Sequence, residues 1–229
     1  MRKSLWVVVA VAAVAVIGCK AKPDPEVSNP WFAATYAFDD AGFGAAAASN
    51  ADINQPNRDK NTPLHEAVLL DNVKAIQFFI SHGAKLDAVD EDRDTPLHFA
   101  AENGKTASGR VLIAAGASVN AQNEDGETAL MLAIKNGYGE LAKAIIAAKP
   151  NLNLPDDDKS TALHYAAEYG QPELVKALLD AGANPAVVDE DGRTPIAVAI
   201  RRGQAACVQI LQRVSAPPGG VATQPTTMP

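Results

Sequence analysis

The chain has 229 residues, of which 47% are hydrophobic and 5% are aromatic. Its 20 basic and 27 acidic residues give a formal net charge of −7. This length and composition suit one soluble domain. The acidic balance disfavours nucleic acids and anionic lipid surfaces as direct partners, because binding to either depends on clustered basic residues.

The first 18 residues have the pattern of an export signal. Met1-Arg2-Lys3 supplies a positive start, and an uninterrupted apolar run follows from Leu5 to Ile17. A membrane-spanning helix needs about 20 apolar residues, so removal of this segment is favoured over its retention as a transmembrane anchor. Its removal takes two basic residues with it and changes the formal charge from −7 to −9.

The signal ends in Val16-Ile17-Gly18-Cys19, which resembles the lipobox of bacterial lipoproteins. The resemblance implies cleavage before Cys19 and attachment of a diacylglycerol to its thiol. Lys20, in place of aspartate, implies sorting to the outer membrane. We therefore expect an exported lipoprotein that faces the periplasm and touches the membrane only through this anchor, with residues 19–28 as the lipidated tether.

From residue 29 onward, the sequence repeats every 33 residues. Five copies of a Thr-Pro-Leu-His-x-Ala motif begin at Thr62, Thr95, Thr128, Thr161 and Thr194. Asn29-Pro30-Trp31 occupies the same register, so a degenerate sixth repeat precedes them. Period and motif resemble those of the ankyrin-repeat family. The resemblance implies an all-α solenoid of about six stacked helix-turn-helix repeats, joined by hairpin-like loops, over residues 29–214, followed by a disordered tail at 215–229.

The repeat motif has a mechanical explanation. Threonine can cap the first helix of a repeat, and proline at the first helical position sacrifices no amide donor. Glycine ends three of the second helices, at Gly83, Gly116 and Gly182. Lys149-Pro150 stands at the corresponding place in another repeat. Because a residue before proline avoids helical geometry, we expect that helix to end earlier or differently.

No catalytic or metal-binding set can be assembled from the sequence. Three histidines, His65, His98 and His164, occupy the motif position at which the family's imidazole braces neighbouring turns. They belong to different repeats, so we do not expect them to share a metal. There is no nucleophile–base pair or glycine-rich phosphate loop, and we expect neither catalysis nor a cofactor. Cys207 is interpreted as a small buried apolar residue.

The loops that join successive repeats are strongly acidic. Tight turns account for one aspartate in each loop, whereas these loops carry two or three acids. The excess is explained either by steering of a basic partner or by solubility alone. The carboxylates assigned to partner steering are Asp92, Asp125, Asp158 and Asp191.

The residue after the motif histidine faces the concave groove in ankyrin proteins. In this chain the series is Glu66, Phe99, Leu132, Tyr165 and Val198, with Tyr169 one turn beyond Tyr165. A largely apolar strip inside an acidic rim is typical of protein-binding hot spots. The alternative is that these side chains pack on neighbouring loops. Our hypothesis is that partner binding uses Glu66, Phe99, Leu132, Tyr165 and Tyr169.

The sequence therefore predicts a monomeric, non-enzymatic scaffold or adaptor that binds another protein of the envelope or periplasm. A narrower alternative is an immunity or inhibitor protein whose acidic face neutralises a basic toxin or hydrolase. A secreted effector that acts in a host cell conflicts with lipid tethering. The repeat fold serves unrelated targets, so it does not identify the partner.

Overall fold

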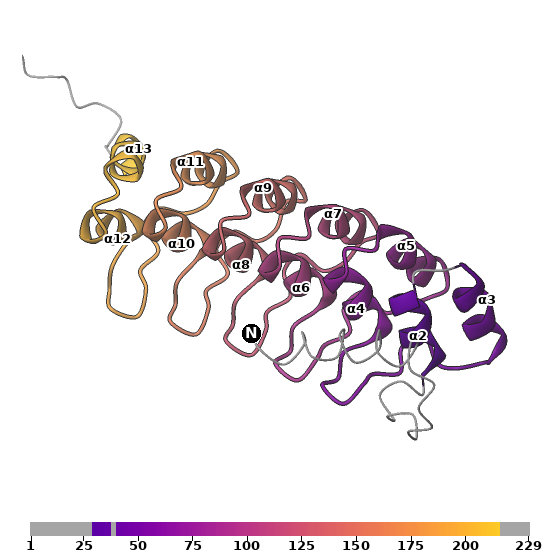
Figure 1. Cartoon of the computed structure of the whole chain (residues 1–229). Coiled ribbons are helices and arrows are strands. Elements are labelled where there is room, and N and C mark those ends of the chain that lie inside the picture. Colours follow the sequence, from indigo (N-terminus) through magenta and orange to yellow (C-terminus); the bar gives the residue numbers. More distant parts are fainter. Residues whose placement is uncertain (1–28, 38–39, 216–229) are drawn as a thin grey trace, which may run out of the picture. The chain divides into compact units, whose positions relative to one another are not determined.

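A computed structural model describes residues 29–37 and 40–215, and every regular element within these ranges is a helix (Figure 1). The predicted signal peptide, Cys19, the tether and almost all of the tail lie outside the described residues. Within the described ranges, no helix has the length and apolar character needed to cross a bilayer.

The chain forms two compact units, an N-terminal unit that ends at Glu124 and a C-terminal unit that begins at Asp125. The helices of the N-terminal unit are α2 (Pro30–Ala37), α3 (Asp40–Ala48), α4 (Pro63–Leu69), α5 (Val73–Ser81), α6 (Pro96–Glu102) and α7 (Thr106–Ala114). Those of the C-terminal unit are α8 (Ala129–Lys135), α9 (Gly139–Ala147), α10 (Ala162–Glu168), α11 (Pro172–Asp180), α12 (Pro195–Arg201) and α13 (Ala205–Ser215).

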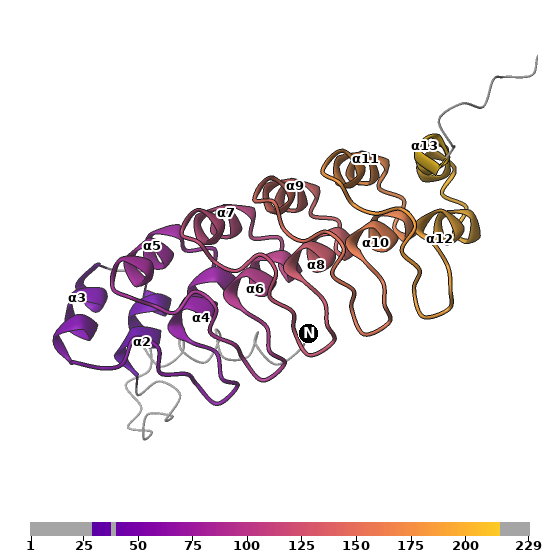
Figure 2. The ribbon, with the colours of Figure 1, turned by 180° about the vertical axis from the view of Figure 1, so that it is seen from behind.

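Each unit is built of helix pairs that stack in two layers. In the N-terminal unit, α4 packs on α2 and α6, and α5 packs on α7. In the C-terminal unit, α10 packs between α8 and α12, and α11 packs between α9 and α13. The loops that connect successive pairs extend from the layer of first helices (Figure 2). This is the predicted all-α ankyrin-repeat solenoid.

Every full repeat begins with the expected helix cap. Thr62, Thr95, Thr128, Thr161 and Thr194 are the N-cap residues. The Thr62 amide donates to His65 Nδ1 over 3.0 Å, so that nitrogen is an acceptor and Nε2 carries the proton. Nε2 then donates to the carbonyl oxygen of Asp94 at 3.2 Å, in the next loop. His164 makes the same pair of contacts, to Thr161 and to Arg193.

The apolar face of each helix pair is buried, as the motif predicts. Leu64, Leu97, Leu130 and Leu163 of the first helices are 2% exposed or less. Cys207 is fully buried and unbridged, and burial raises the pKa of its thiol, which agrees with its interpretation as a small core residue.

Of the two outcomes expected for the helix before Lys149-Pro150, an earlier end is wrong and a different end is confirmed. Helix α9 ends at Ala147, in the same register as α7 and α11, so the helix itself is not shortened. Instead, Lys149 adopts a φ of 56°, the left-handed conformation that Gly182 adopts at the corresponding position with a φ of 94°. A non-glycine residue in this conformation carries strain of roughly 1–2 kcal/mol.

Replacing Lys149 by glycine should therefore stabilise the C-terminal unit. We expect Lys149→Gly to raise its free energy of unfolding by about 1 kcal/mol, because relief of backbone strain exceeds the added entropy of the unfolded glycine. Urea unfolding followed by circular dichroism measures the change. The matched control is Gly182→Ala: a Cβ there would meet no atom within 4 Å, so only the φ of 94° opposes it. An unchanged or lower stability of Lys149→Gly would contradict the strain argument.

Candidate protein-binding surface

The tips of neighbouring loops lie side by side within each unit. In the N-terminal unit, the amide of Glu124 donates to the carbonyl oxygen of Asp92 over 2.8 Å. In the C-terminal unit, Asp157 donates to Asp125 over 3.1 Å and Glu190 donates to Asp158 over 2.8 Å. These backbone bonds hold equivalent loops together. The acidic loops are therefore aligned within each unit.

The acids of one loop have two different environments. The first aspartate folds back on the loop: Asp156 Oδ1 accepts from the Ser160 amide at 2.7 Å, and Asp189 Oδ1 accepts from the Arg193 amide at 2.8 Å. Both side chains are buried. This is the one structural aspartate that turn chemistry explains. The four acids assigned to partner steering are all exposed: Asp92, Asp125, Asp158 and Asp191.

The series expected to face the groove does not form one exposed apolar strip. Glu66 is 6% exposed, and Leu132 and Val198 are each 7% exposed, so these three offer little surface to a partner. Neighbouring packing covers them, as the alternative interpretation holds. Phe99 keeps part of its ring accessible, in the N-terminal unit, and its centroid lies 5.0 Å from that of His65.

In the C-terminal unit, the accessible part of the series is a pair of tyrosines. The rings of Tyr165 and Tyr169 are almost parallel, at an interplanar angle of 3°, with centroids 6.3 Å apart. Tyr165 is half-buried, whereas Tyr169 is 44% exposed. Tyr165 lies in α10 and Tyr169 is the C-cap residue of that helix, so one helix sets the spacing of the two rings.

A buried polar network fixes Tyr165. Its hydroxyl lies 2.8 Å from Glu127 Oε1 and 2.7 Å from Asp156 Oδ2. Lys135 Nζ forms an ion pair with the same Glu127 oxygen at 2.8 Å. Burial, followed by the hydrogen bonds to the two carboxylates, raises the pKa of Tyr165, so its hydroxyl stays protonated. Sequence reasoning missed Glu127 and Lys135, since neither occupies a motif position.

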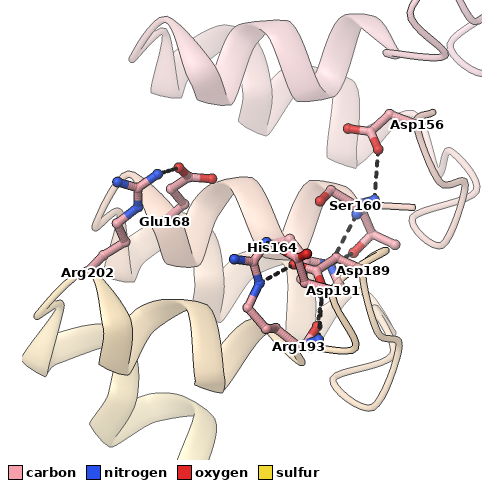
Figure 3. A network of polar contacts seen from close by, with 9 residues as sticks. Asp156, Ser160, His164, Glu168, Asp189, Asp191, Arg193 and Arg202 are labelled. Carbon is pink, nitrogen blue, oxygen red and sulfur yellow. Dashed lines mark hydrogen bonds and ion pairs between the residues drawn. The ribbon is translucent and has the colours of Figure 1, made fainter. Parts of the chain in front are cut away.

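A polar pocket of about 260 Å³ adjoins Tyr165 on the same unit, between α10 and α12 and the loops that precede them. Figure 3 shows its charged walls, in which Arg193 lies beside Asp189 and Asp191, and Arg202 points to Glu168. Its lining includes Asp158, Ser160, His164, Tyr165, Arg193 and Arg202. Asp158 and Tyr165, assigned to partner binding on separate grounds, thus line one pocket.

The histidine in this pocket is a structural group. Burial lowers the pKa of His164, and the imidazole is held at both nitrogens, by Thr161 and by the Arg193 carbonyl. Among the residues that the structure describes, no group of three or more histidine, cysteine or acidic side chains is arranged to hold a metal ion. The surface carries two stacked rings, a polar pocket and exposed carboxylates. Aromatic side chains within a polar rim are typical of protein-binding surfaces.

Comparison with known proteins agrees with the repeat geometry. A family model described as ankyrin repeats (3 copies) matches residues 43–123, 110–189 and 130–218. A search of curated proteins found no match. The three matched segments together extend from residue 43 to residue 218, more than half of the 229-residue chain. The chain therefore belongs to the ankyrin-repeat family, and its repeats form a protein–protein interaction domain.

Proposed function

We propose that this protein is a lipid-anchored, monomeric adaptor that binds another protein of the envelope or periplasm and catalyses no reaction. The observation that carries the proposal is the Tyr165–Tyr169 pair, which is part-exposed above a buried hydrogen-bond network and beside a polar pocket. Phe99 is the corresponding anchor of the N-terminal unit. Of the remaining groove residues, Glu66 and Leu132 are buried and offer little surface to the partner.

The tyrosine pair suits a binding role because it is already ordered. Association costs free energy for each side chain that must be immobilised, about 0.5–1.5 kcal/mol for a mobile one. Tyr165 is held through its hydroxyl and by stacking on Tyr169, so little of that cost remains when a partner arrives. Aromatic rings with one polar end are also the commonest anchors of protein interfaces.

The exposed acidic residues of the loops make the surface negatively charged. Asp92, Asp125 and Asp158 are exposed carboxylates on a chain of net charge −7. Charges at the rim of an interface chiefly accelerate association with an oppositely charged partner. We therefore infer that the partner presents basic groups to the loop tips. Asp191 contributes less, because it shares Arg193 with Asp189.

Removing the anchors should abolish partner capture. The full chain is purified from gently solubilised envelopes beside a Phe99→Ala/Tyr169→Ala variant, and associated proteins are identified by mass spectrometry. We expect one protein to disappear from the variant sample while the helical circular dichroism is unchanged, since neither ring is buried. Tyr138→Ala is the matched control, because that tyrosine is 36% exposed and lies at the start of α9, outside the proposed surface. Equal capture by the double variant would refute the anchor assignment.

Neutralising the loop tips should slow association without loosening the complex. Once the partner is identified, its binding is compared for the wild type and a variant with asparagine at all four positions, Asp92, Asp125, Asp158 and Asp191. We expect the variant to associate about tenfold more slowly at low salt, with little change in the dissociation rate. The difference should vanish at high salt, because exposed charges are screened. Surface plasmon resonance at several salt concentrations measures both rates. Asp180→Asn, on α11, is the control for a change of net charge alone.

The same salt series also tests the alternative function. An immunity or inhibitor protein predicts a tight one-to-one complex with a basic toxin or hydrolase that weakens steeply with salt. A complex that is insensitive to salt would instead assign recognition to the aromatic anchors and contradict the steering role of the acids.

Lipid attachment at Cys19 has its own test. We expect Cys19→Ser to release the protein from the membrane fraction, because the serine hydroxyl does not receive the diacylglycerol and the chain then lacks its anchor. Membrane fractionation measures the release, and intact-mass analysis of the processed chain measures the loss of the diacylglycerol. Cys207→Ser is the matched control, since that thiol is buried in the fold. A Cys19→Ser protein that stayed membrane-bound would remove the lipoprotein assignment.

A further inference from the structure

The Tyr165 hydroxyl lies within hydrogen-bond distance of two carboxyl oxygens but has only one proton to donate. It lies 2.8 Å from Glu127 Oε1 and 2.7 Å from Asp156 Oδ2, both carboxyl oxygens. A phenol has a single proton to donate, and an ionised carboxylate has none. If both acids were ionised, one of the two short contacts would bring lone pairs together. A second proton must therefore be present in this network.

That proton belongs on Asp156. Glu127 Oε1 also accepts from the ammonium of Lys135 at 2.8 Å, an ion pair that favours the carboxylate form of Glu127. Asp156 is 7% exposed, and no cation within the described residues forms an ion pair with it. Its other oxygen, Oδ1, accepts from the Ser160 amide at 2.7 Å, which leaves Oδ2 to carry the proton toward Tyr165.

The neighbouring charges do not supply an alternative donor. From α8 and the loop before it come Lys135, paired with Glu127, and Asp125. From α10 and its C-cap come His164 and Tyr169. From the loops come Asp158, Asp189 and Arg193, whose guanidinium is paired with Asp189. His164 is neutral, because burial lowers its pKa. Asp158 adds negative charge near Asp156. Burial is the largest influence on Asp156 and raises its pKa, and the Asp158 charge acts in the same direction. The hydrogen bonds with Tyr165 and with the Ser160 and Asp158 amides oppose them, and the resulting pKa of Asp156 lies above its usual range.

We propose that Asp156 holds its proton in the folded protein and is the positioning residue of the binding surface, donating to Tyr165, which in turn donates to Glu127. When rising pH removes that proton to solvent, Asp156 becomes a second buried carboxylate, and Tyr165 keeps its bond to Glu127 alone. The Tyr165–Tyr169 pair then loses one of the contacts that order it. Partner binding through these rings is consequently stronger at the acidic side of the transition.

The proton assignment is independent of any partner, whereas its effect on binding rests on the proposed function. The two can fail separately. Carboxyl-detected NMR of the full chain tests the assignment alone, and capture of the partner at several pH values tests the consequence. An intact titration with capture that is absent or unchanged at every pH would overturn only the proposed function.

The NMR experiment follows the Cγ shift of Asp156 and the Cζ shift of Tyr165 between pH 3 and pH 9. We expect Asp156 to titrate at a higher pH than an aspartate in an unstructured peptide, which serves as the reference. Tyr165 Cζ should change in the same step. An Asp156 midpoint equal to or below that of the unstructured peptide would overturn the proposal, as would a Tyr165 Cζ shift that did not change in the Asp156 step.

Asp156→Asn is the decisive variant, because asparagine imitates the protonated acid. Its Oδ1 can still accept from the Ser160 amide, and its Nδ2 can donate to the Tyr165 oxygen. We expect the variant to fold and the Tyr165 Cζ step to be lost. Asp156→Ala cannot replace the bond, so its Tyr165 signal should resemble the deprotonated wild type at every pH. A Tyr165 step that persisted in Asp156→Asn would overturn the proposal, and the wild-type titration decides it if a variant fails to fold.

Discussion

The hydrogen bond between a cap threonine and the side chain three residues later is the contact on which the rest of each unit depends. In His65 and His164 the imidazole accepts from the cap amide, which fixes the tautomer, and it then donates to a carbonyl of the following loop. One side chain thereby starts a helix and attaches the next loop. Because burial lowers the pKa of His65 to about 4, the ring stays neutral and can act as acceptor and donor at once.

The tyrosine network lies beside one of the two places in the C-terminal unit where this link changes, the other being Ala197 in the last repeat. Met131 replaces the histidine, and its sulfur lies 3.4 Å from the Thr128 amide, but a thioether has no proton to give to the next loop. Tyr165 connects the two repeats instead, since Glu127 precedes α8 and Asp156 precedes α10. The surface that we assign to binding therefore also replaces the histidine link between two repeats. This structural role holds the Tyr165 side chain in place.

Much of this fold could be predicted because its determinants are local. The 33-residue period, the cap threonines and the loop aspartates act over a few residues and recur in every repeat. The candidate site could be predicted only in part. Tyr165 and Asp158 have motif positions, but the Glu127–Tyr165 bond joins residues 38 apart, and no local pattern marks it. The burial of Leu132 depends on packing by neighbouring elements, and the left-handed backbone of Lys149 depends on tolerated strain. Neither can be predicted from the 33-residue repeat of the sequence.

In the three loops that begin with Asp90, Asp156 and Asp189, different residues hold the turn and form the tip, and this affects how such a protein can diverge. One aspartate holds the turn through backbone amides, and backbone bonds join neighbouring tips, so the fold makes few demands on the side chains between these points. Residues 91–92, 157–158 and 190–191 can then change in sequence while the scaffold stays intact. Substitutions at the loop tips can therefore change which partner is bound. Descendants of one chain could acquire different partners without first losing stability.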